Sequence, residues 1–442
     1  MKKNILIIFL LFLTVNFTFP YQYKQDTINI TGDIVKIKGS NIKDSELSKY
    51  IFMLRTADMV IFQEYNPETS ELKEIYSTRE NCIDFEIFND FLILLKKSSI
   101  EYVPLDGSKP KKLRDIATVF PIRLGINYRN NFIFKFDDDN YAISIPEDDG
   151  YRVYFGMGDK PITSKGVFLP GEVKTEFSVS YNSIPPSEKL SYEFKYLHIF
   201  SKGDDRYFTV FVGNSILLYK IINNEDLSLE FKIKIAPYKN FRYSFRDIDL
   251  NGHRDLMIFS DIYTSTKVEI YFDGDISTPP LISRIKENAV DIHGGRLDKG
   301  KLSDLLVIYY IQPIALKQYV KKDKVLDVYF VPRIQWEKGR YKRMPTKAYK
   351  FIQVDGKSDL FYTLNNFFLS DITGDKIEDV IYYYKGKLSV HINDEKLGIG
   401  GLPIFTIDVG DIKRISYVYN ADKIKNDILV FKSGKLMILK FF

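Results

Sequence analysis

A short acidic loop that leads directly into an apolar strand occurs twice in this chain, and it is the feature that most limits the possible folds. The first copy spans residues 247–255 and reads DIDLNGHRD, followed by LMIF. The second copy spans residues 371–379 and reads DITGDKIED, followed by VIYYY. Fainter versions precede other apolar strands. A loop that returns at intervals, each time before a strand, indicates a repeat architecture.

The spacing of these strands predicts the kind of repeat. Taking the start of each apolar strand as an anchor gives a ladder along the chain: Tyr50, Phe91, Phe132, Thr209, Asp255, Asp304, Asp379 and Asp427. Most gaps lie between 41 residues (Tyr50 to Phe91) and 49 residues (Asp255 to Asp304). That is the length of a four-stranded propeller blade. We therefore predict an all-β β-propeller of about eight four-stranded blades, or seven if an amino-terminal unit is miscounted.

Local patterns support strands joined by tight turns. Segments such as DVIYYY-KGK-LSVHI read as strand, turn and strand, and the 31 tyrosines and 34 phenylalanines favour strands over helices. The chain ends after three strands of its last unit, while residues 27–37 offer an extra strand. We expect the amino- and carboxyl-terminal strands to pair and close the ring, which removes exposed sheet edges. The two long gaps predict insertions near 151–195 and 311–350 in a single domain, residues 21–442.

The amino terminus predicts export. Two lysines precede an apolar run from Ile5 to Val15, too short to span a bilayer comfortably, so residues 1–20 read as a signal peptide. No later stretch is long and apolar enough for a membrane span, so we expect no transmembrane segment in the mature chain. Cys82 is the single cysteine, which excludes an intramolecular disulfide. The expected location is the periplasm, the cell surface or the medium.

The two acidic loops have the chemistry of a cation site. Side-chain oxygens at the first, third and fifth places and at the last suit a hard cation such as Ca²⁺. Alternatively, these polar side chains cap the turn by hydrogen bonds to the backbone. In the second loop a threonine replaces one carboxylate and Lys376 takes the place of the glycine.

The two loops resemble the FG-GAP or VCBS-type repeats of integrin-α-like β-propellers, in which a loop joining two strands of a blade holds calcium. The resemblance covers about half of the mature chain. It implies structural Ca²⁺ in both loops, with these ligands in the first: Asp247, Asp249, Asn251, the His253 carbonyl and Asp255. In the second loop it implies Asp371, Thr373, Asp375, the Ile377 carbonyl and Asp379.

The segment 311–350 is strongly basic, with 11 Lys and Arg against 3 Asp and Glu. It also holds the single tryptophan. Interleaved basic and aromatic residues suit a polyanion or an anionic membrane surface. Candidate contact residues are Trp336, Arg340, Lys342 and Arg343. The alternative is an elongated hairpin whose lysines discourage edge pairing. Nucleic acid is not expected as a partner of an exported chain.

These patterns favour a non-enzymatic binding or scaffold propeller with a protein or glycan partner at the cell envelope. The alternative is an envelope polysaccharide hydrolase or lyase with its site at the mouth of the channel. For that alternative the sequence offers only His198 and His293, at equivalent places before their anchors. Converging ionisable groups in the channel would favour an enzyme, and propellers host many unrelated activities.

Overall fold

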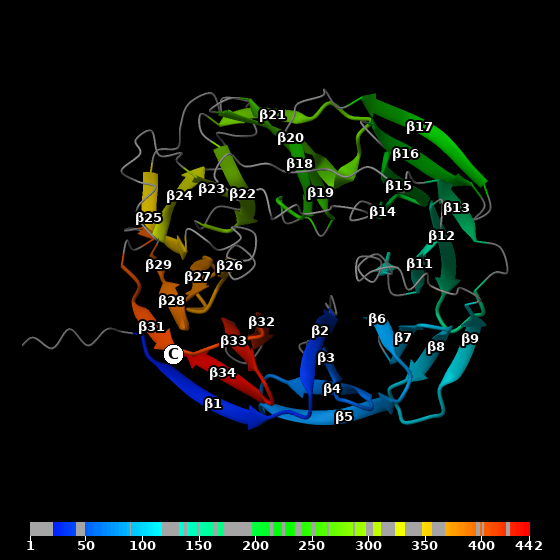
Figure 1. The fold of residues 1–442 in the computed structure, drawn as a ribbon, viewed down its shortest axis with the longest axis horizontal. Coiled ribbons are helices and arrows are strands. Elements are labelled where there is room, and N and C mark those ends of the chain that lie inside the picture. Colours follow the sequence, from blue (N-terminus) through cyan, green and yellow to red (C-terminus); the bar gives the residue numbers. More distant parts are fainter. Residues whose placement is uncertain are drawn as a thin grey trace, which may run out of the picture.

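The chain is an all-β propeller in this computed structural model (Figure 1). The structure describes most of residues 21–442. Residues 1–20 and several connecting segments, the longest being 117–131, 171–196, 311–322, 332–346 and 356–366, lie outside the described part. Within that part, eight four-stranded sheets follow one another around a ring, as the anchor spacing predicted.

The first four blades are named in chain order, with the innermost strand of each first. Blade I is β2 (Asp33–Ser40), β3 (Lys49–Arg55), β4 (Val60–Asn66) and β5 (Glu71–Thr78). Blade II is β6 (Cys82–Ile87), β7 (Phe91–Lys96), β8 (Ser99–Pro104) and β9 (Lys111–Asp115). Blade III is β10 (Phe132–Lys135), β11 (Asn140–Glu147), β12 (Gly150–Met157) and β13 (Val167–Pro170). Blade IV is β14 (Leu197–Lys202), β15 (Asp205–Val212), β16 (Ser215–Ile222) and β17 (Asp226–Lys234).

The remaining blades follow the same order. Blade V is β18 (Phe241–Arg246), β19 (Asp255–Ile262), β20 (Ser265–Tyr271) and β21 (Leu281–Ile285), with a 3-10 turn, η2 (Phe272–Gly274), after β20. Blade VI is β22 (Asn288–Gly295), β23 (Asp304–Tyr310), β24 (Asp323–Val331) and β25 (Lys347–Asp355). Blade VII is β26 (Phe367–Ser370), β27 (Asp379–Tyr384), β28 (Lys387–His391) and β31 (Phe405–Asp408), with the small pair β29 (Asn393–Asp394) and β30 (Gly398–Ile399) inserted. Blade VIII is β32 (Arg414–Asn420), β33 (Lys425–Lys432), β34 (Lys435–Phe441) and β1 (Tyr23–Asn29).

The ring closes through its two chain ends, as predicted, but the amino-terminal strand of the pair is Tyr23–Asn29 and not 27–37, because residues from Asp33 onward form the innermost strand of blade I. Strand β1 pairs antiparallel with β34 in the register Tyr23↔Phe441 to Asn29↔Lys435. The amino-terminal strand is thereby the outermost strand of the last blade (Figure 1).

The core lies between neighbouring blades. In β3 four consecutive side chains, residues 51–54, are fully buried. Ile51 and Met53 pack against blade II, while Phe52 and Leu54 pack against blade VIII. Alternate residues of a strand point to opposite faces, and both faces of each sheet are covered. This is why the second strand of a blade reads as a continuous apolar run.

Two boundaries differ from the prediction. The anchor Phe132 lies on the first strand of blade III and not on its second, β11. The predicted insertion near 151–195 therefore begins too early, because residues 150–157 and 167–170 are regular strands of that blade. Likewise residues 323–331 and 347–350 of the predicted insertion 311–350 belong to strands β24 and β25 of blade VI. The short run FIFK looked like a second strand because both inner strands of a blade are apolar.

Among the described residues, no helix has the length and apolarity needed to cross a bilayer.

Candidate cation site and its surroundings

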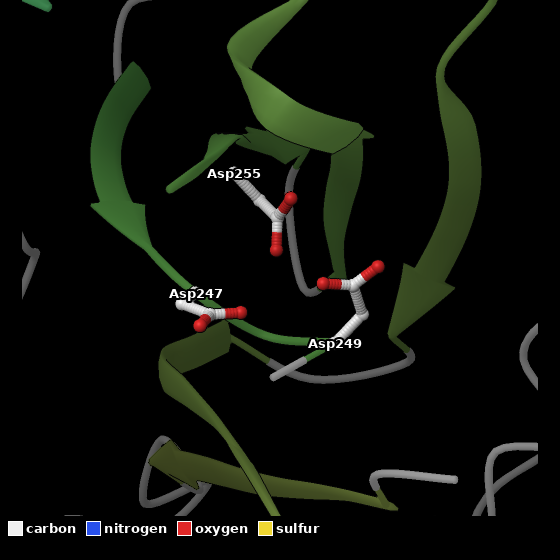
Figure 2. Close-up of side chains that lie close together, drawn as sticks. All are labelled: Asp247, Asp249 and Asp255. Atoms are coloured by element: carbon white, nitrogen blue, oxygen red, sulfur yellow. The ribbon is translucent and has the colours of Figure 1, made fainter. Parts of the chain in front are cut away.

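Three carboxylates converge in the first acidic loop, which joins the two inner strands of blade V. Asp247 follows β18, Asp249 lies in the loop, and Asp255 begins β19. Their side chains point toward one another (Figure 2), and one oxygen from each lies within 4.8 Å of the other two. Asp247 and Asp249 are partly exposed, whereas Asp255 is fully buried.

Asp255 is held by the backbone on both of its oxygens. The amide of Ile248 donates to Oδ2 at 2.7 Å, and the amide of Asp273 donates to Oδ1 at 2.9 Å. Burial raises the pKa of Asp255 to about 7, and the nearby charges of Asp249 and Asp247 add to this rise. Three carboxylates this close repel one another, and a hard divalent cation would remove that repulsion. The donor set therefore fits Ca²⁺.

The other predicted residues of the first loop, Asn251 and His253, are exposed. The amide of His253 donates to Asn251 Oδ1 at 2.7 Å, and Asn251 Nδ2 donates to Asp249 Oδ2 at 3.3 Å. Asn251 thus organises the loop through its side chain. The ligand roles of Asn251 and of the His253 carbonyl stay predictions.

The second acidic loop joins β26 and β27 of blade VII, the equivalent place, but it is arranged differently. Its last residue, Asp379, is fully buried and accepts from the amides of Ile372 (3.1 Å) and Asn393 (2.9 Å). Asp371, however, accepts from the amides of Gly374 (2.6 Å) and Lys376 (2.9 Å) within its own loop.

The remaining predicted ligands of this loop also have local contacts. Asp375 accepts from the Ile377 amide at 2.9 Å, and the Thr373 hydroxyl donates to Asp371 at 3.4 Å. Among the described residues, three acidic, His or Cys side chains converge in blade V, and Asp371, Asp375 and Asp379 do not form such a group. The ligand roles predicted for the second loop stay predictions.

Sequence reasoning missed Asp273, which lies in the η2 turn of blade V. Its Oδ1 accepts from Asn251 Nδ2 at 2.8 Å, and its amide holds Asp255. The two segments are brought together only by the pairing of β19 with β20. The signal that could have identified Asp273 is the register of β19 and β20, in which Leu256 pairs with Tyr271. Asp273 lies two residues after Tyr271.

His198 lies on the innermost strand of blade IV, as its equivalence to His293 suggested, but its ring is buried. It stacks on Phe245 (4.5 Å between centroids) and on Phe200 (5.5 Å). Burial lowers its pKa to about 3, and the nearby Arg254 and His253 act in the same direction. An imidazole with so low a pKa is a weak base, and its enclosure keeps it from contact with a substrate. The His293 side chain lies outside the described residues.

Ionisable side chains do converge on the innermost strands of blades I and II. Lys36 pairs with Asp84, and Lys38 pairs with Glu86 (2.7 Å) and with Asp84 (3.5 Å). Asp84 also accepts from the amide of Ile133 on β10 at 2.9 Å. Because each carboxylate is neutralised by a lysine, the cluster is suited to joining strands. The predicted contact residues Trp336, Arg340, Lys342 and Arg343 lie outside the described part of the chain.

Comparison with known proteins identifies no family for this chain. No protein-family model matches this sequence, and no curated protein matches it.

Solved structures that resemble the chain include the Dos1 propeller, with a TM-score of 0.47 and 11% identity over 94% of each chain. The N-terminal domain of Nup159 gives a TM-score of 0.37 and 9% identity over 96% of each chain. An uncharacterized protein from Listeria monocytogenes EGD-e gives 0.39 and 10% identity over 88% of this chain and 98% of that chain. The propeller assignment rests on the chain's own sheet order, and the resemblance to FG-GAP or VCBS repeats stays a prediction.

Proposed function

We propose that this chain is an exported, non-enzymatic binding or scaffold propeller whose blade V is stabilised by Ca²⁺. The observation that carries the proposal is the convergence of Asp247, Asp249 and Asp255 within 4.8 Å. Carboxylates at this separation favour a hard cation. Because the loop connects two strands of the same blade, the ion's role is to stabilise the loop and not to take part in a reaction. The partner is a protein or glycan at the cell envelope.

Two features support a scaffold over the alternative of an envelope polysaccharide hydrolase or lyase. The buried His198 has a strongly lowered pKa. The converging charges of blades I and II are mutually paired, and Asp84 is further engaged by two backbone amides. An acid or base in catalysis needs a group free to exchange a proton with substrate.

The cation site is tested by matched substitutions in the two loops. Asp249→Asn removes one charge from the first loop without removing the bonds that hold the buried Asp255. Asp375→Asn makes the same change in the second loop. Isothermal titration with CaCl₂ should show one site in the wild type, a loss of affinity of about tenfold or more in Asp249→Asn, and an unchanged site in Asp375→Asn.

No Ca²⁺ binding by the wild type, or equal effects of both substitutions, would contradict the cation site. The partner is tested separately by pull-down and glycan-array experiments with the purified chain. These are run with Ca²⁺ and with EDTA, and hydrolysis of envelope polysaccharide in the same samples would overturn the non-enzymatic reading.

A further inference from the structure

We infer that Asp273 is a positioning residue of the blade V cation site and that its turn transmits cation binding to blade IV. The inference rests on the proposed Ca²⁺ site, and it adds a residue outside the loop and a consequence beyond the blade. Asp273 is joined to the converging carboxylates from two directions. Its side chain holds the Asn251 amide at 2.8 Å, and its backbone amide holds Asp255 at 2.9 Å.

The backbone conformation of Asp273 allows both of these contacts. Its φ is 54°, in the left-handed region, where aspartate and asparagine are tolerated better than other non-glycine residues. This conformation directs the amide to Asp255 while the carboxylate reaches the loop. Asp273 therefore adds a carboxylate that is connected to Asp249 through the side-chain amide of Asn251.

Blade VII provides an internal comparison, because Asn393 takes the place of Asp273 there. Val380 pairs with His391 as Leu256 pairs with Tyr271, and the two residues stand two places further on. The Asn393 amide donates to Asp379 at 2.9 Å, which repeats the bond to Asp255. The backbone device is common to both blades. The carboxylate of Asp273 stands beside the loop whose three carboxylates converge, and the side-chain amide of Asn393 stands at the equivalent place in blade VII.

The η2 turn also contacts blade IV. The Gly274 carbonyl accepts from the buried Thr209 hydroxyl at 3.3 Å, and Asp275 pairs with Lys202 at 2.6 Å. The His198 ring lies directly against Gly274, since a Cβ there would come within 2.9 Å of its Cδ2 atom. Three consecutive residues thus link the acidic loop on one side to β14 and β15 on the other.

In blade VII the equivalent turn also contacts the preceding blade, but it does so through the side chain of Asn393, whereas in blade V Gly274 and Asp275 make the contact. Asn393 Nδ2 donates to the carbonyl of Leu297, next to blade VI, at 2.9 Å. The turn is therefore a repeated contact between adjacent blades. In blade V the turn carries the Asp273 carboxylate, which contacts the acidic loop. A bound ion that fixes Asn251 and Asp255 would also fix Asp273, and with it the seam between blades IV and V.

The test uses Asp273→Asn, which copies the residue of blade VII, tolerates the positive φ and keeps the backbone bond to Asp255. Asp275→Asn is the matched control in the same turn. Titration with CaCl₂ should show affinity lowered about tenfold in Asp273→Asn and changed less than about twofold in Asp275→Asn. The melting temperature of Asp273→Asn in EDTA should equal that of the wild type, which separates a role at the site from a purely structural role.

Hydrogen exchange then tests the transmission. Adding Ca²⁺ to the wild type should slow amide exchange in β14 and β15, and it should not do so in Asp273→Asn at Ca²⁺ concentrations that saturate the variant. Wild-type affinity in Asp273→Asn, or unchanged exchange in β14 and β15 of the Ca²⁺-bound wild type, would overturn this inference alone. Absence of Ca²⁺ binding by the wild type would overturn the proposed site as well.

Discussion

At the scale of single residues, His198 shows how burial controls charge. In the folded chain its pKa lies at about 3, because the ring is enclosed between aromatic side chains. In the unfolded chain it titrates near its ordinary value of 6.5. Below pH 6.5 the unfolded state binds a proton at His198 that the folded state does not bind. His198 therefore costs stability as the pH falls from 6.5 toward 3, and it has no such effect above 6.5.

Replacing this histidine should remove that part of the acid sensitivity. Between pH 7.5 and pH 5 the wild type should lose about 2 kcal/mol more free energy of unfolding than His198→Gln. Urea unfolding in EDTA at both pH values measures this. Other titrating groups act on both proteins, so only the difference counts. Identical pH dependence in the two proteins would show that the ring is protonated in the folded state.

At the scale of elements, the innermost strands are joined by charge as well as by apolar packing. The side chain of Asp84 is only 1% exposed, and it contacts Lys36 of β2 and the Ile133 amide of β10. One carboxylate thus links blades I, II and III. Glu86 lies two residues further along β6, is 15% exposed and has one lysine partner at 2.7 Å. The two acids should differ in importance, since breaking a buried pair leaves uncompensated charge.

Asp84→Ala should lower the free energy of unfolding by about 3 kcal/mol. Glu86→Ala, the matched change on the same strand and face, should cost about 1 kcal/mol or less. Urea unfolding followed by tyrosine fluorescence gives both values. Similar losses for the two variants would mean that the amide bonds to Asp84 add nothing to its ion pair.

At the scale of the whole molecule, closure of the ring depends on seven residues from the start of the described chain. Strand β1 covers the edge of β34, whose residues Leu436 to Leu439 are nearly or fully buried. An uncovered apolar edge strand pairs readily with other chains. The ring is therefore expected to unfold as a unit once this strand is lost.

A chain that begins at Gly32 should melt roughly 5 °C or more below a chain that begins at Tyr21, and it should aggregate on heating. Differential scanning calorimetry with light scattering measures both effects. A peptide of residues 21–31 added in trans should restore part of the difference, while a scrambled peptide should not. Equal melting of the two chains would show that β1 is dispensable.

The amino-acid sequence was sufficient to predict the class of fold, the approximate number of blades, the pairing of the two terminal strands and the place of the first acidic loop. These features arise from local patterns: continuous apolar strands, turn residues and loops in which the relevant oxygens lie within nine positions. The Phe132 anchor failed because in blade III the first strand, FIFK, is more continuously apolar than the second, NYAISIPE, and so the insertions were placed too widely. Export, the Ca²⁺ ligands and the partner stay predictions.

Only the tertiary structure decided which side chains from distant segments meet. Asp273 reaches the loop because β19 and β20 pair in one particular register, and Asp84 meets Lys36 because adjacent innermost strands run side by side. The two acidic loops look alike in sequence, and in both of them carboxylates accept from amides of their own loop, yet three carboxylates converge only in the first among the described residues. Such differences depend on side-chain direction and on neighbouring blades. Neither the side-chain direction nor the neighbouring blade can be read from the order of residues in the sequence.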